Sequence, residues 1–375
     1  MRILFTHSGN MYGGVETMLA TFARHSGLSP ALQQHFALCF EGRLRDELDE
    51  CGVPVHELGY VRIRQPLSVR RARQAFTNLL NDVAFDTVVS QSAWSHALFG
   101  PVAQSLGVPL VNWIHGIADR DSWLEQWARR TPAELTICNG EFTAQAFRKS
   151  SPAARLEVLH CPVAAPAQSF SKGNRAQVRA ELKTANDAIV IIQASRMEPW
   201  KGHQTLLDAL AALRDSDHWV CWIVGGPQRP NEVGHFNELI ARAQDLGIAD
   251  RIRFTGQQAH VARLLAAADI FCQPNIDPEP FGISFVEALY AGLPVVTTEV
   301  GGAREIITDR CGVLVEPRNV QHLSRVLRQL IDDRTLRCRL GSSGPWRATE
   351  LCDPRQQLVR FEQILSNVTR RQMAA

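Results

Sequence analysis

The sequence has little that would tie it to a membrane or to an oxidising compartment. Its 375 residues contain no run of 18 apolar residues, and the opening stretch MRILFTHSG enters a strand-like segment without a basic leader. The nine cysteines form no CxxC pair and no Cys/His metal spacing, and their odd number argues against a disulfide framework. We therefore expect a cytoplasmic protein that neither spans a membrane nor carries a standard export signal.

Two further classes lack their usual signals. The formal net charge is only +2, so no overall field calls for a nucleic-acid partner. No GxGxxG follows the first strand-like segment, where a nicotinamide dinucleotide site would carry one, so a nicotinamide oxidoreductase is the weakest reading. A chain of this length, with 45% apolar residues, has room for two folded domains with separate cores.

Short apolar and β-branched runs alternate with segments of helical period along the chain. In the first half the runs are RILFT, TVVS, PLVNWI and LTIC, and the helical segments that follow them are 14–25, 94–106, 121–130 and 141–149. This alternation is typical of parallel βαβ units. It pauses at 160–174, which we interpret as a linker, and resumes with AIVIIQAS, WVCWIVGG, RIRFTG, IFCQPN, PVVTT and GVLVEP.

We predict two α/β domains in tandem, each a doubly wound parallel sheet with helices on both faces. Ligands of such sheets bind outside the carboxyl ends of the strands, so two of them facing each other would share a cleft. The segments 319–349 and 355–370 are helical by period, and Pro354 between them is expected to break the helix.

Glycines follow the first strand. Gly13 and Gly14, in GNMYGGVE, separate it from a helix that begins at about Val15. Glycine allows close backbone approach, and a helix N-terminus offers free N–H groups to an anion. A tight turn without a ligand is the alternative.

Two cations follow a strand of the second half. Arg196 and Lys201, in ASRMEPWKGHQ, come after the strand 188–195 and at the head of a helix. Cations there oppose the helix dipole unless an anion is bound, so they could hold a diphosphate. The alternative is a pair of solvated surface cations.

Two carboxylates lie in the apolar stretch EPFGISFVEALYAGLPVV. Glu279 is expected in a loop, and Glu287 in the second turn of a helix that starts near Gly282. A carboxylate offers two acceptor oxygens to vicinal hydroxyls, as on a sugar or a ribose. A capping acid and a solvated helix glutamate are the alternative. His115, in NWIHG, ends another strand and is either structural or a cleft residue.

Together these stretches resemble the retaining nucleotide-sugar glycosyltransferases of family 4, which have the GT-B fold. The resemblance rests on SRMEPWKG, EPFGISFVEALYAGLPVV, GGAREII and GVLVEP, with GGVE and HG in the first half. It implies a hexosyltransferase (EC 2.4) that moves a hexosyl unit from a UDP- or GDP-linked sugar to a hydroxyl acceptor with retention of configuration. The acceptor would be a cell-surface polysaccharide, lipopolysaccharide or glycolipid precursor.

The resemblance also implies a domain plan and residue roles. Residues 1–162 would form the acceptor-side domain and 163–350 the nucleotide-sugar domain, with 351–375 a helix that packs back on the first. Arg196 and Lys201 would bind the donor diphosphate, Glu287 the ribose and Glu279 the transferred sugar. The donor-binding set is Gly13, Gly14, Arg196, Lys201, Glu279, Phe281, Gly282, Ile283 and Glu287, and the catalytic set is Glu279, His115, Arg196 and Lys201.

No cofactor and no metal is expected. The two cations and a helix N-terminus would stabilise the charge that grows on the leaving diphosphate. The DRD at Asp119 to Asp121 has the DxD spacing of metal-dependent transferases, but it precedes a helical segment and is better interpreted as an N-cap region.

A basic stretch bears on the acceptor. From Leu58 to Asn81 there is no acidic residue, and an apolar stripe at helical spacing carries arginines beside it. These membrane or acceptor candidates are Arg62, Arg64, Arg70, Arg71 and Arg73. We expect weak, salt-sensitive contact with anionic lipid at the inner face of the plasma membrane. An ordinary surface helix is the alternative.

Two other functions stay open at this point. A GT-B-like sugar-nucleotide epimerase or phosphorylase would share the fold, and only a transferase would release the nucleoside diphosphate on addition of an acceptor. A non-catalytic sugar-binding relic would not need Arg196, Lys201, Glu279 and Glu287 together. Neither the base nor the sugar of the donor follows from the sequence.

Overall fold

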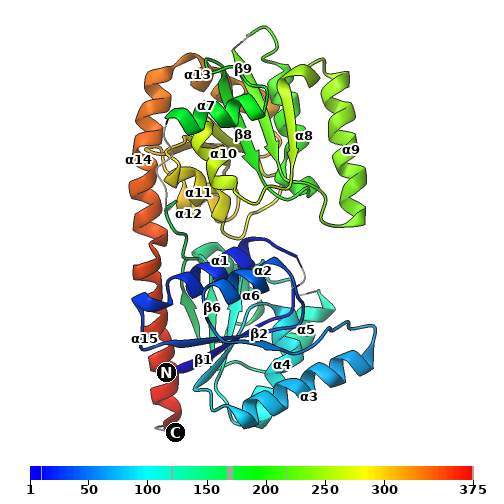
Figure 1. Ribbon diagram of the computed structural model, residues 1–375, viewed down its shortest axis with the longest axis vertical. Coiled ribbons are helices and arrows are strands. Elements are labelled where there is room, and N and C mark those ends of the chain that lie inside the picture. The colour runs from blue at the N-terminus through cyan, green and yellow to red at the C-terminus, as the bar shows by residue number, and fades with distance from the viewer. Residues whose placement is uncertain (10, 120, 167–171, 217, 374–375) are drawn as a thin grey trace. The chain divides into compact units, whose positions relative to one another are not determined.

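The apolar runs of the first half form one parallel sheet. The structure is a computed structural model that describes residues 1–9, 11–119, 121–166, 172–216 and 218–373. Within those ranges the sheet has the order β3-β2-β1-β4-β5-β6-β7 (Figure 1). Its strands are β1 (Arg2–His7), β2 (Gln33–Leu38), β3 (Val55–Glu57), β4 (Thr87–Ser90), β5 (Leu110–Ile114), β6 (Leu135–Cys138) and β7 (Leu156–Val158).

The order in which successive strands are added to the sheet reverses at β1, which pairs with β2 on one side and with β4 on the other. In doubly wound sheets this switch point leaves room for a ligand at the carboxyl edge. The connecting elements of this unit are α1 (Gly14–Arg24), η1 (Ser26–Leu28), α2 (Arg43–Glu50), α3 (Pro66–Asp82), α4 (Ala93–Ser105), α5 (Trp123–Ala128) and α6 (Glu141–Ser150).

Successive apolar side chains of β1 point to opposite faces of this sheet and help to form the core on each. Leu4 packs with the apolar side of α3 and α4, while the next residue, Phe5, contacts rings on the opposite face. There Phe361 of the C-terminal helix α15 (Pro354–Met373) lies 5.8 Å from Phe5, 5.1 Å from Phe22 and 5.2 Å from Trp113 between ring centroids. The last helix thus belongs to the first unit's core.

The second half forms a second parallel sheet with the order β10-β9-β8-β11-β12-β13 among the described strands. The strands are β8 (Ile189–Ala194), β9 (Trp219–Val224), β10 (Ile252–Gly256), β11 (Ile270–Gln273), β12 (Val295–Thr298) and β13 (Gly312–Val315). Its switch point lies between β8 and β11, which pair directly. The predicted α/β class, with two doubly wound parallel sheets, is confirmed.

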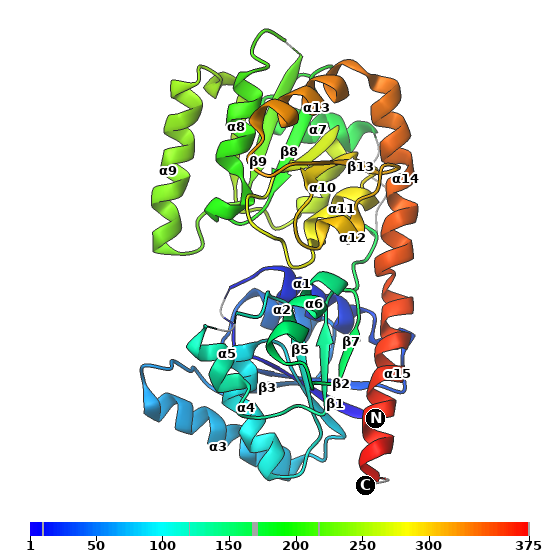
Figure 2. The ribbon, with the colours of Figure 1, turned by 180° about the vertical axis from the view of Figure 1, so that it is seen from behind.

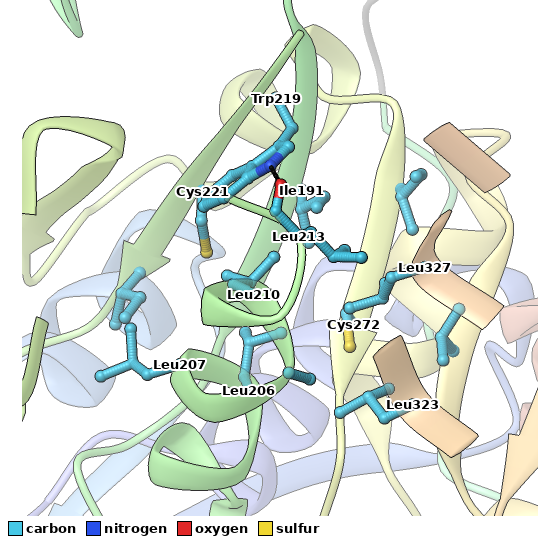
Figure 3. Packing of buried hydrophobic residues seen from close by; sticks show 14 of the residues in the cluster. Ile191, Leu206, Leu207, Leu210, Leu213, Trp219, Cys221, Cys272, Leu323 and Leu327 are labelled. Carbon is cyan, nitrogen blue, oxygen red and sulfur yellow. Dashed lines mark hydrogen bonds between the residues drawn. The ribbon is translucent and has the colours of Figure 1, made fainter. Parts of the chain in front are cut away.

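Helices cover both faces of the second sheet (Figures 1 and 2). They are α7 (Lys172–Glu181), η2 (Pro199–Lys201), α8 (His203–Ala211), α9 (Pro230–Asp245), η3 (Ala249–Arg251), α10 (Val261–Ala267), α11 (Ile283–Tyr290), α12 (Ala303–Ile306), α13 (Val320–Asp332) and α14 (Arg334–Cys352). Leucines of α8 and α13 pack on one face of the sheet, and Trp219 on β9 donates its indole N–H to the Leu213 carbonyl at 3.0 Å (Figure 3). Burial raises the pKa of the Cys221 and Cys272 thiols in this core, so both act as apolar residues.

The chain divides into two compact units, Met1–Val163 with Cys352–Ala375, and Ala164–Leu351. Part of the expected linker, 167–171, lies outside the described residues. One helical expectation was wrong in detail: 319–349 is not one segment, because α13 ends at Asp332 and α14 runs on to Cys352. The predicted break at Pro354 is confirmed, because α14 ends at Cys352 and Pro354 is the first residue of α15, a position that suits a residue without an N–H.

Candidate functional site

The predicted cations and carboxylates of the second unit gather at one edge of its sheet. Arg196 and Lys201 follow β8, and Glu279 lies in the loop after β11. Because β8 and β11 are neighbouring parallel strands, their following loops meet at the switch point.

Lys201 and Glu279 form a buried ion pair. Each residue is only 8% exposed, and Lys201 Nζ lies 2.5 Å from Glu279 Oε2. The ammonium also lies 3.9 Å from the centre of the Trp200 ring. Burial lowers the pKa of Lys201 and the charge of Glu279 opposes that shift. The two opposite charges compensate each other, and a diphosphate could bind to the ammonium or a sugar hydroxyl to the carboxylate.

Two amides also reach the same carboxylate oxygen. Gln273 Nε2 and Asn275 Nδ2 each lie 3.2 Å from Glu279 Oε2. Over the described residues, no hydrogen bond reaches the other oxygen, Oε1. The sequence interpretation missed both amides, although they stand in IFCQPN, directly after the strand.

Arg196 pairs with the carboxylate of Glu198, which lies two residues along the chain, and not with Glu279. Its Nη2 lies 2.9 Å from Glu198 Oε2, and a third of its side chain is exposed. Glu198, within SRMEPWKG, was not predicted as a site residue. The guanidinium is thus oriented and still accessible, which suits an arginine that receives an anion.

Close backbone packing shapes the Glu279 loop. Gly301 has φ +68°, and a Cβ there would lie 2.2 Å from the Glu279 carbonyl oxygen. The N–H of Gly302 donates to the same oxygen at 2.7 Å. A side chain at Gly202 would likewise lie 1.9 Å from the Pro274 carbonyl. Glycine is required at these positions, so GGAREII and WKGH fix the loop's path.

Helix α11 begins beside Glu279. Phe281 is buried and Gly282, with φ +110°, is the N-cap. A Cβ on Gly282 would lie 2.3 Å from the Phe285 ring. The N–H groups of Ile283 and the next residue have no helical acceptor before them, so the positive end of the α11 dipole lies next to the Glu279 loop.

Glu287 lies in the second turn of α11, as predicted. Burial raises the pKa of its carboxyl group from 4.5 to about 7. Within the part of the chain that the structure describes, no hydrogen bond or ion pair reaches it. A desolvated carboxylate without a partner is ready to accept two hydroxyls.

The glycine turn of the first unit differs from expectation in one respect. The Gly13 N–H is not free, because it donates to Glu16 Oε2 at 2.8 Å. The other oxygen, Oε1, lies 2.8 Å from His7 Nε2. Burial works to raise the pKa of Glu16, but His7 and the Gly13 N–H lower it overall. The Glu16 carboxylate thus caps part of this helix N-terminus, and Gly14 is the first residue of the helix.

His115 follows β5 and is fixed by its neighbours. Its Nε2 lies 2.8 Å from Gln91 Oε1, and its ring stacks on Trp113 at 5.4 Å between centroids. Burial and the nearby His7 lower the pKa of His115 to about 3. The ring is therefore neutral, with Nε2–H donating to Gln91 and Nδ1 left as an acceptor.

The basic stretch of the first unit falls into two groups. Arg62, Arg64, Arg70 and Arg71 are exposed. Arg73 does not belong with them: its Nε donates to the Leu98 carbonyl at 2.8 Å and its Nη2 to the Ala97 carbonyl at 3.0 Å. The prediction that Arg73 faces a membrane or an acceptor is corrected, because its guanidinium is used within the fold.

Asp119 and Asp121 form a local turn. The Asp121 N–H donates to Asp119 Oδ1 at 2.9 Å, ahead of α5. Over the described ranges, no group of three or more Asp, Glu, His or Cys side chains is placed to hold a metal ion. Arg120, between them, lies outside the described residues.

Comparison with known families decides what kind of protein this is. Residues 12–165 match the model described as Glycosyltransferase Family 4, and 174–346 match that of Glycosyl transferases group 1. The chain belongs to the family 4 glycosyltransferases. The first match covers most of the first unit and the second match most of the second unit, so the recognised family extends over both.

Several proteins of known activity are similar in sequence to this chain. It is 32% identical over 268 residues to the D-inositol 3-phosphate glycosyltransferase of Streptomyces avermitilis, covering 64% of this chain and 57% of the relative. It is also 32% identical over 204 residues to a GDP-mannose-dependent alpha-(1-6)-phosphatidylinositol monomannoside mannosyltransferase of Mycobacterium tuberculosis, covering 52% and 51%. The match therefore spans about half the length of these curated relatives.

Solved structures agree with the GT-B assignment. Anabaena HepE in complex with UDP-glucose superimposes with a TM-score of 0.86 at 25% identity, over 98% of this chain and 100% of that one. WaaG, a glycosyltransferase involved in lipopolysaccharide biosynthesis, has a TM-score of 0.73 at 19% identity, over 95% and 98%. The predicted GT-B fold is confirmed.

Proposed function

We propose that the protein is a retaining hexosyltransferase of class EC 2.4 that uses a UDP- or GDP-linked sugar. The observation that carries this proposal is the buried Lys201–Glu279 pair, with Arg196 beside it, at the switch point of a sheet. Diphosphate, sugar and ribose each require a different chemistry, and this edge supplies cations, a carboxylate with a free oxygen, and a desolvated carboxylate.

Each donor group has a proposed partner. Arg196 and Lys201 bind the diphosphate, together with the N-terminus of α11 at Phe281, Gly282 and Ile283. Glu279 binds hydroxyls of the transferred hexose through its free oxygen, and Glu287 binds the ribose. The names of relatives support this donor class, since one structure holds UDP-glucose and one relative depends on GDP-mannose.

The proposed reaction needs no metal. As the anomeric C–O bond breaks, its electron pair passes to the diphosphate, where Arg196, Lys201 and the α11 N-terminus stabilise the added charge. The acceptor oxygen forms the new bond on the face that the leaving group vacates. A leaving phosphate oxygen takes the acceptor's proton, so the products are a glycoside of retained configuration and a nucleoside diphosphate.

The first unit contributes further groups to this proposal. The α1 N-terminus at Gly13 and Gly14 is a candidate for phosphate, with the Gly13 N–H shared with Glu16. His115 is neutral and accepts a sugar hydroxyl at Nδ1 rather than acting as a proton donor. Its proposed role is therefore to position the sugar.

We further propose an acceptor on an anionic membrane, at the cytoplasmic face of the plasma membrane. Arg62, Arg64, Arg70 and Arg71 are exposed beside Tyr60, Ile63 and Leu67, whose exposed fractions are 47%, 37% and 68%. Basic and apolar side chains that alternate through a loop and the first turns of α3 suit a lipid interface, and each arginine adds about 1 kcal/mol near an anionic surface. A lipopolysaccharide, polysaccharide or glycolipid precursor fits such a surface. None of the helices within the described ranges is both long and apolar enough to cross a membrane.

Flotation with vesicles tests the membrane proposal. Wild type should float with phosphatidylserine-containing vesicles at low salt, and less at high salt or with phosphatidylcholine alone. Arg70→Ala/Arg71→Ala should weaken this, while Arg325→Ala, an exposed arginine of α13, should not. Absence of binding at low salt would contradict the proposal.

Release of nucleoside diphosphate tests the transferase itself. Wild type is incubated in EDTA with UDP-glucose or GDP-mannose, with and without a membrane extract as acceptor. We expect acceptor-dependent release that Glu279→Gln removes and Glu238→Gln, with a 68% exposed side chain, retains. Phosphate-dependent or acceptor-independent turnover would favour a phosphorylase or epimerase, and binding without turnover would favour a sugar-binding relic. NMR of the purified glycoside then tests retention.

A further inference from the structure

Two side chains next to the proposed sugar-binding carboxylate have no place in the donor contacts above. Gln273 ends β11 and Asn275 lies two residues later, and both are fully buried. Buried amides must satisfy several donors and acceptors, so their placement at a site edge needs a reason.

The hydrogen bonds of the two amides run in one direction. Ser284 Oγ lies 3.3 Å from Gln273 Oε1, Gln273 Nε2 lies 3.0 Å from Asn275 Oδ1, and both amide nitrogens reach Glu279 Oε2. A carboxylate only accepts, so Glu279 fixes which end of each amide faces it. The orientation of the chain of amides and that of the carboxylate depend on each other.

The amides are themselves anchored to the neighbouring strand β12. Thr297 Oγ1 donates to the Gln273 carbonyl at 2.8 Å, and Thr298 Oγ1 donates to the Asn275 carbonyl at 2.6 Å. The Glu279 backbone is fixed separately by Gly301 and Gly302. The two amides and the backbone of the carboxylate that they contact are thus held at one edge of the sheet.

With Lys201 and both amides on Oε2, the second oxygen is the one left to accept from a ligand. We infer that Gln273 and Asn275 are positioning residues, which hold Glu279 so that Oε1 alone is presented to the hydroxyls of the donor hexose. The inference rests on the proposed function. Without the amides, the carboxylate is free to rotate and pair both oxygens with Lys201, which would draw it away from the sugar.

Binding of ligands with and without the hexose separates this role from a merely structural one. Calorimetry with UDP, UDP-glucose, GDP and GDP-mannose identifies the ligand pair that wild type binds. For that pair, Asn275→Ala should weaken the nucleotide sugar by about tenfold, as expected for a lost bond to a charged group, and leave the nucleoside diphosphate unchanged. Thr184→Val is the matched control, because it removes buried hydrogen bonds of the same unit at a residue that neither contacts Glu279 nor anchors the two amides.

A double-variant cycle tests whether Asn275 acts through Glu279. In a Glu279→Gln background, Asn275→Ala should have little further effect on binding of the nucleotide sugar. The same factor in both backgrounds, or equal weakening of the diphosphate and the sugar nucleotide, would overturn the inference. Asn275→Ser has a side chain too short to reach the carboxylate in the same way, so it should also weaken the nucleotide sugar relative to the nucleoside diphosphate. It replaces Asn275→Ala if that variant unfolds.

Failure of the inference differs from failure of the proposed function. If wild type binds none of the four ligands, both the proposed function and this inference fail. If wild type binds a nucleotide sugar and both Asn275→Ala and Asn275→Ser are indistinguishable from Thr184→Val, only this inference fails.

Discussion

Glu287 should lower the stability of the ligand-free protein, while its carboxylate favours binding of the donor. Its carboxyl group is desolvated, has no partner over the described residues, and has its pKa raised by burial from 4.5 to about 7. Ionisation is therefore less favourable in the folded than in the unfolded chain. We predict that Glu287→Gln, which keeps the shape and removes the charge, stabilises the ligand-free protein above pH 7.

The magnitude follows from the size of that shift. A shift from 4.5 to about 7 corresponds to roughly 3 kcal/mol at about 1.4 kcal/mol per pH unit. Glu287 is partly exposed, so solvent reduces this, and we expect about 1–2 kcal/mol. For a unit of this size that is a rise of about 2–8 °C in Tm.

The dependence on pH has a definite sign. Because the folded pKa is raised, wild type loses stability relative to Glu287→Gln as pH rises from about 4.5 to about 7. Thermal unfolding at pH 5, 6, 7 and 8 measures this difference, with the exposed Glu238→Gln as control. Donor affinity should fall about tenfold or more in Glu287→Gln, since a charged acceptor is lost. A variant that is less stable than wild type at pH 8, or a difference that does not grow with pH, would refute the reasoning.

Three further predictions concern other contacts of the structure. Arg73→Ala should lower the free energy of unfolding by about 1–3 kcal/mol, because it removes two hydrogen bonds to α4 carbonyls, and one of them, that of Ala97, lacks its usual helical donor since Pro101 has no N–H; Arg71→Ala should leave the free energy unchanged, and urea unfolding of both variants checks this. Lys201→Met should destabilise by about 3–5 kcal/mol by leaving Glu279 buried and unpaired, and adding Glu279→Gln should recover part of that loss; additive effects would argue against the pair. Gly301→Ala should reduce donor affinity, because its Cβ would displace the Glu279 loop, and calorimetry that finds wild-type affinity would contradict this packing.

The strands at the centre of each sheet could be predicted because both of their faces are apolar. RILFT and AIVIIQAS form β1 and β8, and their parallel neighbours follow from the alternation of strand and helix. The strand β2 and the edge strand β3 were not singled out, since QQHFAL begins with polar residues and VHE is only three residues long. Their place in the sheet depends on pairing with a partner strand, which local sequence does not record.

The site was predictable where a residue type itself suggests chemistry. Arg196, Lys201, Glu279 and Glu287 are charged and follow strands, so their positions could be inferred. Their pairing could not, because the contact between Lys201 and Glu279 joins residues 78 positions apart. Neutral amides such as Gln273 and Asn275 carry no such signal, and their use became visible only from the direction of their hydrogen bonds.

The most direct test of the account is titration calorimetry of the protein with UDP-glucose and with GDP-mannose in EDTA. Wild type should bind one of them, and Arg196→Ala/Lys201→Ala should lose that binding while Arg325→Ala retains it. Binding that is unchanged in the double variant would place the diphosphate elsewhere. No binding of either ligand by wild type would contradict the assignment of a nucleotide-sugar donor.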